Sequence, residues 1–228
     1  MPLPEFTATL EQKKYLTNDV MYLSFTTPES SFKAGQYVML KIVRQGEIKW
    51  KPYSILNPPS EKGKIDLCAK IIPGGFASEY FKEANLGDTL IVRGPIGLFV
   101  LEENDPNEVW LVCAGTGVVP FYSMIKEYLP RFPQKKFVLL FGVRQQQGLF
   151  FHDELKQLQQ KYRNFTYIPT LSRDSWDGQT GRVQLHLPPN LLGKTFYLCG
   201  LKEMVLETKE LLMQKGVALK NIKAERYT

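Results

Sequence analysis

The hydrophobic pattern of the chain changes near residue 108, and this change constrains the fold more than any other feature. Before it, short runs rich in β-branched and aromatic residues are separated by turn residues. After it, longer apolar runs alternate with helix-like segments. The first pattern is typical of an antiparallel barrel or sandwich, and the second of a parallel sheet wound with helices. The sequence therefore predicts two domains of different classes.

The first hundred residues carry the pattern of an antiparallel Greek-key β-barrel. Turn residues such as Pro, Gly, Asn and Ser separate short runs rich in Val, Ile, Leu, Tyr and Phe. Runs of this length and spacing predict strands in a barrel rather than βαβ units. The expected strands cover 20–25, 37–42, 65–70 and 89–92, and one helix covers 76–83.

The remainder predicts an α/β doubly wound sheet of five parallel strands. Continuous apolar runs are typical of parallel strands that are buried on both faces. The expected strands cover 109–113, 136–143, 165–171, 195–199 and 222–226. Three helices are expected: one that follows the first strand and ends at residue 128, one over 152–162 and one over 202–214. The polar, proline-containing segment 102–107 has the composition of a linker. The predicted domains are therefore 1–101 and 108–228.

The net charge differs between the two halves. The chain has 29 Lys and Arg against 23 Asp and Glu, and the whole excess of six positive charges lies in residues 105–228. A basic second domain is expected to face an anionic partner. Because the basic residues are scattered rather than clustered, a nucleic acid is not the expected partner.

Other features exclude several classes of protein. No apolar run approaches the ~18–20 residues that span a bilayer, and the start lacks a signal-peptide pattern, so we expect a cytoplasmic protein without a membrane partner. A disulfide framework or a metal site is not expected from the few, widely separated candidates, Cys68, Cys113, Cys199, His152 and His186.

A glycine-containing turn at Ala114–Pro120 lies between an expected strand and an expected helix. Glycines let the backbone turn tightly and approach a ligand, and the start of a helix offers unpaired N–H groups to a phosphate. Pro120 stands where the dinucleotide fingerprint has its third glycine, and Pro is well tolerated in a first helical turn. Taken alone, the segment is either a phosphate loop or a plain tight turn.

Two further segments lie in the barrel half. Lys51–Ser54 combines a cation, an aromatic ring and a hydroxyl at the edge of a strand, a set that suits a flat, phosphate-bearing ligand. Pro73–Ser78 is a glycine-rich turn that opens the expected helix and can cradle a second phosphate. Taken alone, Lys51–Ser54 reads as an ordinary strand. Pro73–Ser78 taken alone is either a phosphate cradle or a loop with a helix cap.

Together these segments resemble the motifs of the ferredoxin–NADP reductase family, in the same order and at similar spacing. The matching segments are Lys51–Ser54 (R-x-Y-S), Gly75–Ser78 (G-x-x-S), Arg93–Phe99 (G-P-x-G-x-F), Gly115–Pro120 (G-T-G-x-x-P) and Tyr197–Gly200 (C-G). The resemblance runs from about residue 35 to the end of the chain. It implies a flavin barrel followed by a pyridine-nucleotide domain.

The resemblance also implies an activity. Hydride would pass between NADPH and bound FAD, and single electrons would pass to or from a separate carrier. Since no cysteine cluster for an iron–sulfur domain is present, that carrier would be another molecule, ferredoxin or flavodoxin, both typically acidic. A pyrophosphate site favours FAD over FMN, NADH is the alternative coenzyme, and a monomer is expected.

Carried over position by position, the resemblance implies three sets of residues. The flavin set is Lys51, Pro52, Tyr53, Ser54, Gly74, Gly75, Phe76, Ala77 and Ser78. The pyridine-nucleotide set is Gly115, Thr116, Gly117, Arg144, Ser172, Arg173, Arg182, Cys199, Gly200 and Tyr227. The set expected at the point of hydride transfer is Ser54, Cys199, Glu225 and Tyr227. Lys51 departs from the usual Arg, keeping the charge but not the bidentate fork.

Coenzyme choice is assigned to the Ser172–Arg173 pair and Arg182, which follows Arg173 by nine residues, with Arg144 as a further candidate. Guanidinium groups suit a 2′-phosphate, which NADH lacks. The alternative is two solvated surface arginines, and Asp174 or Asp177 would then be able to neutralise them.

The last residues fit the end of the family, where an aromatic covers the flavin and a carboxylate precedes it. Tyr227 and Glu225 occupy those places, and Thr228 lies beyond them. The alternative is a frayed terminus.

Two rival functions stay open. A reductase of the same fold would treat flavin as a diffusible substrate, which Lys51 favours. A non-catalytic flavin-binding subunit would instead transfer electrons within a larger enzyme.

Overall fold

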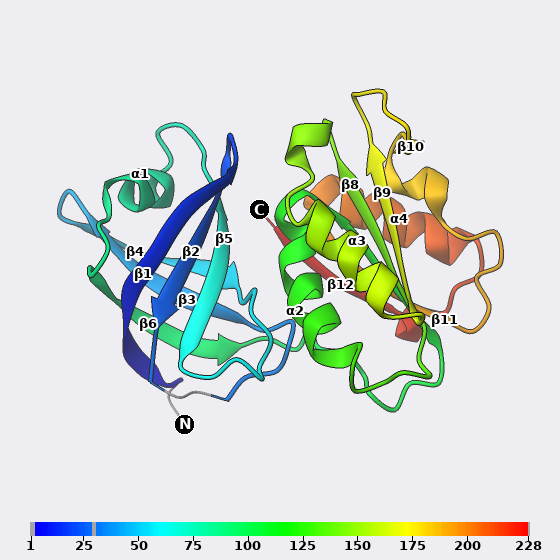
Figure 1. The fold of residues 1–228 in the computed structure, drawn as a ribbon, viewed down its shortest axis with the longest axis horizontal. Coiled ribbons are helices and arrows are strands. Elements are labelled where there is room, and N and C mark those ends of the chain that lie inside the picture. The colour runs from blue at the N-terminus through cyan, green and yellow to red at the C-terminus, as the bar shows by residue number, and fades with distance from the viewer. Residues whose placement is uncertain (1–2, 29–30, 228) are drawn as a thin grey trace. The chain divides into compact units, whose positions relative to one another are not determined.

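The computed structural model describes residues 3–28 and 31–227, so residues 1–2, 29–30 and Thr228 lie outside the described residues. It forms two compact units (Figure 1). Unit 1 comprises residues 1–101 and 122–127, and unit 2 comprises residues 102–121 and 128–228. The predicted linker 102–107 thus groups with unit 2, and a segment of one helix groups with unit 1.

The described residues of unit 1 form a six-stranded antiparallel sheet with helix α1 (Phe76–Glu83) and a segment of a helix that is shared with unit 2. Its strands are β1 (Glu5–Thr17), β2 (Val20–Thr26), β3 (Tyr37–Arg44), β4 (Glu47–Ser54), β5 (Lys64–Lys70) and β6 (Thr89–Ile96). The order is β4-β3-β6-β1-β2-β5, and the two outer strands β4 and β5 also contact each other. The predicted antiparallel barrel is confirmed.

Alternation along the strands builds the barrel core. In β3, Val38, Leu40 and Ile42 are fully buried, and the residues between them are partly exposed. This period of two sends one face of each strand inward. They pack with Phe25, Phe81 and other buried side chains of unit 1.

Unit 2 is an α/β unit with a parallel sheet. Its strands are β7 (Glu108–Ala114), β8 (Phe137–Val143), β9 (Phe165–Leu171), β10 (Gln179–Thr180), β11 (Lys194–Leu201) and β12 (Ile222–Tyr227), in the order β10-β9-β8-β7-β11-β12. Its helices are α2 (Val118–Tyr128), which is shared with unit 1, α3 (His152–Lys161) and α4 (Lys202–Gln214). The predicted doubly wound parallel sheet is confirmed, with six strands rather than five.

The sequence of β8 shows why this sheet is parallel and covered. All seven of its residues are buried, as expected for a strand with helices over both faces. Helix α3 packs against β9, and α4 against β11 and β12, on opposite faces of the sheet in Figure 1.

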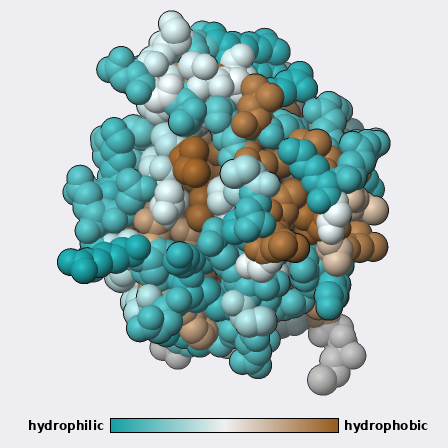
Figure 2. Space-filling model, turned by 90° about the vertical axis from the view of Figure 1, so that its right-hand side faces the viewer, coloured by the Kyte–Doolittle hydropathy of each residue, from teal (hydrophilic) through white to brown (hydrophobic). Residues whose placement is uncertain are grey.

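The surface of unit 2 is mixed in polarity. Brown apolar areas are interrupted by polar side chains on the face in Figure 2, and Leu185 and Leu192 are among the exposed apolar residues of this unit. Such scattered exposure is normal for protein surfaces.

None of the helices within 3–28 and 31–227 has the length and apolar character that crossing a bilayer requires.

Candidate flavin and pyridine-nucleotide sites

The predicted flavin motif Lys51–Ser54 forms the end of β4, which pairs with β3 so that Val38 faces Tyr53. Pro52 is tolerated because β4 is an outer strand of the hydrogen-bonded sheet. The Tyr53 ring packs edge-to-face on Phe81 of α1, with 5.5 Å between the ring centroids. Burial raises the pKa of the Tyr53 phenol well above its ordinary value, so its hydroxyl stays neutral and able to donate.

The second flavin motif is a tight turn ahead of α1. At Gly74 φ is +71°, and a Cβ there would point into open space. At Gly75 a Cβ would lie 3.0 Å from the Ile72 carbonyl oxygen. Gly75, the N-cap residue of α1, provides no side-chain cap, so the first N–H groups of the helix have no capping side chain. Uncapped N–H groups at the start of a helix suit a phosphate group, and the open space beside Gly74 lies next to this helix start in the chain.

One donor of this turn already has a carboxylate partner. The Gly74 N–H donates to Glu79 Oε1 at 3.2 Å, and the same oxygen accepts from Lys82 Nζ at 2.9 Å. These hydrogen bonds, that from Lys82 first, lower the pKa of Glu79. A phosphate bound by the Gly74 N–H would have to displace the Glu79 carboxylate.

Ser78 is buried and its hydroxyl is used within the turn. Its Oγ accepts from the Ile72 N–H at 2.9 Å and donates to the Lys70 carbonyl oxygen at 3.4 Å. The structure thus gives the hydroxyl a role in shaping the turn, and any contact between Ser78 and a phosphate falls to its backbone N–H.

We expect Ser78→Ala to lower the free energy of unfolding by about 1 kcal/mol, because the Ile72 N–H loses its acceptor. Chemical denaturation of the protein measures this change, with the exposed Ser60→Ala as a control in the same unit. Equal unfolding midpoints for the two variants would contradict the assigned role.

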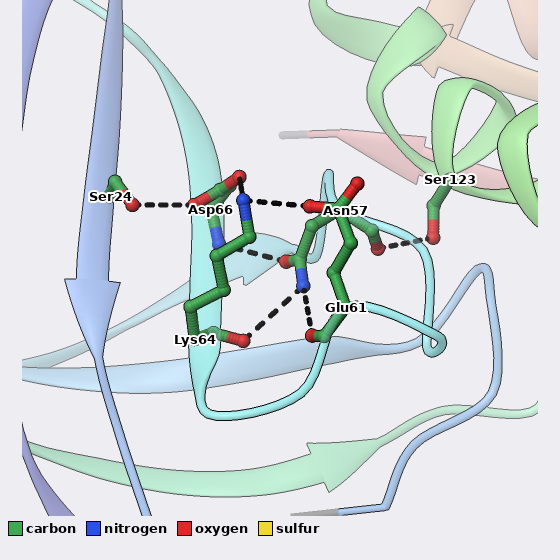
Figure 3. A network of polar contacts seen from close by, with 6 residues as sticks. All are labelled: Ser24, Asn57, Glu61, Lys64, Asp66 and Ser123. Carbon is green, nitrogen blue, oxygen red and sulfur yellow. Dashed lines mark hydrogen bonds and ion pairs between the residues drawn. The ribbon is translucent and has the colours of Figure 1, made fainter.

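The loop that follows the flavin motif is held by Asn57, which is buried (Figure 3). Its side-chain amide donates to the carbonyl oxygens of Glu61 (3.2 Å) and Lys64 (3.3 Å), and its Oδ1 accepts from the Asp66 N–H at 2.9 Å. Ser123, in the part of α2 that belongs to unit 1, donates to the Asn57 carbonyl oxygen at 2.8 Å. The Asp66 carboxylate accepts from two further side chains, Ser24 (2.6 Å) and Lys64 (2.9 Å).

In unit 2 the turn Gly115–Gly117 joins β7 to α2 and lies against the Cys199–Gly200 segment of β11. A Cβ on Gly117 would overlap the Cys199 carbonyl oxygen and lie 2.8 Å from the Gly200 Cα. A Cβ on Gly200 would lie 3.0 Å from the Ala114 carbonyl oxygen. The structure therefore brings two of the predicted nucleotide motifs together, at the carboxyl ends of adjacent strands, where parallel sheets bind ligands.

Cys199 is fully buried, and burial raises the pKa of its thiol well above the ordinary value. The thiol forms a hydrogen bond with the Tyr227 side chain. The thiol therefore stays protonated. The Cys199 carbonyl group lies against Gly117, and its sulfur contacts Tyr227.

The C-terminal residues are strand rather than frayed chain. Residues Ile222–Tyr227 form β12, in which Glu225 is paired with Cys199 and Tyr227 with Leu201. The frayed-terminus alternative is wrong for these residues. Glu225 and Tyr227 are both partly exposed.

Three predicted arginines gather at the carboxyl ends of β8, β9 and β10. The Arg173 N–H donates to the Arg144 carbonyl oxygen at 2.9 Å, and the Gly181 N–H, next to Arg182, donates to the Leu171 carbonyl oxygen at 2.7 Å. Ser172 follows β9 directly, and its N–H and its hydroxyl both donate to the Val143 carbonyl oxygen. These hydrogen bonds bring the backbones of the three arginines together at the carboxyl ends of the strands.

One of the two predicted neutralising aspartates has backbone partners instead of an arginine. Asp174 accepts from the backbone N–H groups of Gln146 and Ser175. Within residues 31–227, neither Asp174 nor Asp177 forms an ion pair with an arginine. The acidic partner of Arg182 is instead Glu207 of α4, with 3.2 Å between Nη1 and Oε2.

Trp176 anchors the loop between Arg173 and Arg182. Its Nε1 donates to the Gln179 carbonyl oxygen at 2.8 Å, and its ring packs against His152 with 5.8 Å between centroids. Sequence reasoning missed this residue, although a large aromatic in a polar loop was the available signal.

Two family models match the chain. An oxidoreductase FAD-binding domain matches residues 7–101, and an oxidoreductase NAD-binding domain matches residues 111–210. The first match begins well before residue 35, where the resemblance was expected to start. The reason is β1, whose polar sequence hides a strand that pairs with both β2 and β6.

Relatives span the same two domains. The chain is 34% identical to ferredoxin–NADP reductase B of Sorangium cellulosum, over 97% of each chain. It is 30% identical to the xylene/toluene monooxygenase electron transfer component of Pseudomonas putida, over 98% of this chain but 65% of that longer protein. The crystal structure of an Amycolatopsis cytochrome P450 reductase is 26% identical, with a TM-score of 0.92 over 100% of this chain and 71% of that one.

The two family models match an FAD-binding domain followed by an NAD-binding domain, which is the order of the two units. The Sorangium relative matches over 97% of its length. The chain therefore belongs to the ferredoxin–NADP reductase family of FAD- and NAD(P)-dependent, electron-transferring oxidoreductases.

Proposed function

We propose that this reductase oxidises NADPH and delivers single electrons to a separate acidic carrier protein, ferredoxin or flavodoxin. The observation that carries the choice of NADPH is the gathering of Arg144, Arg173 and Arg182 at one edge of the nucleotide unit. Guanidinium groups bind phosphate strongly through paired, charge-assisted hydrogen bonds. A 2′-hydroxyl gives three arginines nothing comparable to bind.

The residues of unit 1 fit FAD. Lys51 supplies a positive charge, Tyr53 a ring with a neutral hydroxyl, and the uncapped start of α1 supplies donors for a pyrophosphate. FAD held there would supply an acceptor for the hydride of the reduced nicotinamide and a donor of single electrons. The protein's part is to bind and orient the two groups and to exclude water.

In unit 2, the Gly115–Gly117 turn is the proposed site for the coenzyme pyrophosphate. Tyr227 and Glu225 on β12 are proposed to lie near the nicotinamide, with Ser54 as the hydrogen-bonding group on the flavin side. The contact between the Cys199 thiol and Tyr227 supports a positioning role for Cys199.

The choice of an acidic carrier is supported by charge. All of the net positive charge lies in residues 105–228, and opposite charges accelerate encounter between electron-transfer partners. The name of the Pseudomonas relative points to a monooxygenase as the partner of that protein, so an oxygenase component is the second candidate acceptor for this chain.

A rival function, reduction of diffusible flavin, is favoured by two features of unit 1. Lys51 lacks the bidentate fork of Arg, and Glu79 already accepts from the Gly74 N–H. Both features lower the expected affinity for the flavin phosphates.

The visible spectrum of the purified protein tests the proposal against this rival. We expect about one flavin per chain, released on heating and identified as FAD by chromatography. A colourless protein that reduces added flavin would contradict bound FAD. Steady NADPH oxidation with an artificial acceptor is also expected, and its absence would favour the non-catalytic subunit.

A further inference from the structure

One of the three arginines is already paired within the protein. Arg182 Nη1 lies 3.2 Å from Oε2 of Glu207, which α4 presents from a position 25 residues further along the chain. The same carboxylate oxygen accepts from Gln184 Nε2 at 3.4 Å. In the described part of the chain, Arg144 and Arg173 form no ion pair with a carboxylate.

The pair can open at small cost. The Arg182 side chain is 73% exposed and that of Glu207 is 52% exposed. An exposed ion pair of this kind alters an equilibrium by about two- to fivefold. A coenzyme phosphate, which carries more charge than a carboxylate, can therefore draw Arg182 away from Glu207.

We propose that Glu207 is a specificity-determining residue of the coenzyme site, which competes with the 2′-phosphate for Arg182. This inference rests on the proposed function of Arg173 and Arg182. NADPH must break the Arg182–Glu207 pair and also meets the negative charge of Glu207. NADH has a 2′-hydroxyl, so its binding neither breaks this pair nor meets charge repulsion from Glu207. Glu207 therefore lowers the ratio of the affinity for NADPH to the affinity for NADH.

The competition predicts a selective gain when the charge of Glu207 is removed. In Glu207→Gln the side chain keeps its size and can still accept a hydrogen bond from Gln184, but the ionic attraction to Arg182 is lost. We expect this variant to bind 2′,5′-ADP about two- to fivefold more tightly than the wild type does, with unchanged binding of 5′-AMP. The gain should shrink at high salt, because screening weakens the exposed pair.

Calorimetric titration of the purified flavin-loaded protein measures both ligands. Glu210→Gln is the matched control, since Glu210 lies on the same helix and, among the described residues, its side chain has no hydrogen bond or ion pair other than the hydrogen bond from Gln214. This control should leave both affinities unchanged. If the role of Glu207 were purely structural, its substitution would lower the unfolding temperature and would change the affinities for 2′,5′-ADP and 5′-AMP equally. Glu207→Ala repeats the test with a second side chain.

Three results would overturn the proposed competition, and they differ in what they imply for the proposed function. If the wild type prefers 2′,5′-ADP and Arg182→Ala loses that preference, but Glu207→Gln and Glu207→Ala change nothing, the competition is overturned while the proposed function stands. If the wild type binds 2′,5′-ADP no better than 5′-AMP, the phosphate role of the arginines fails, and the competition fails with it. Equal tightening of both ligands in Glu207→Gln would also overturn the competition.

Discussion

Gly117→Ala is expected to reduce kcat/KM for NADPH about a hundredfold and to destabilise the protein by about 1–3 kcal/mol. The added Cβ would overlap the Cys199 carbonyl oxygen and lie 2.5 Å from its carbonyl carbon. Both are backbone atoms, so no rotamer change relieves the overlap. The turn and β11 must move apart, and overpacking of this kind costs about 1–3 kcal/mol. A displacement near 1 Å at a positioning element costs on the order of a hundredfold in rate.

Gly193→Asn is the matched control for this prediction. Gly193 lies in unit 2 outside the proposed coenzyme site, with φ +65°, and a Cβ there meets nothing within 4 Å. Asn tolerates this left-handed conformation better than most residues. We expect a loss of less than tenfold for the control, measured by steady-state kinetics with an artificial acceptor and by chemical denaturation. Similar losses for the two variants would show that the contact with Cys199 is not the reason Gly117 is required.

Arg173→Ala is expected to raise KM for NADPH about 10- to 100-fold and to leave KM for NADH unchanged. A hydrogen bond to a charged group contributes about 1.5–3 kcal/mol, and each 1.4 kcal/mol corresponds to a factor of ten. Arg173 follows β9, where its backbone is tied to Arg144, so removing its side chain leaves the strand bonding intact.

The comparison with Arg163→Ala separates this effect from a general loss of positive charge. Arg163 is an exposed arginine in unit 2, ahead of β9 rather than after it. Its loss should change both coenzymes by less than twofold. A parallel rise in KM for NADPH and NADH in Arg173→Ala would argue against a 2′-phosphate contact.

The regular elements with strong periodicity were predictable from the sequence. The helices 76–83 and 202–214 have the bounds of α1 and α4, because their apolar spacing and the glycines next to their ends are local signals. Strand β1 was missed, since only two of its thirteen residues are buried. Its stability comes from pairing with two neighbours, which a sequence pattern does not display. Strand β10 was missed because its two residues, which pair with β9, are too few to show a period.

For the sites, sequence reasoning found residue types but not their contacts. The three arginines were chosen from spacing and resemblance, and the ends of parallel strands bring them together. The Glu207 partner depends on how α4 packs on the sheet, and the use of the Ser78 hydroxyl depends on the path of a turn. Such contacts arise from tertiary packing and have no local sequence signal.

Anaerobic titration of the flavin-loaded protein with NADPH and with NADH, followed by flavin absorbance, tests the central claim most directly. We expect about one equivalent of NADPH to bleach the bound flavin rapidly, and NADH to do so at least tenfold more slowly at the same concentration. Equal rates with the two coenzymes, or a flavin that neither reduces, would contradict the proposal that this chain is an NADPH-dependent FAD reductase.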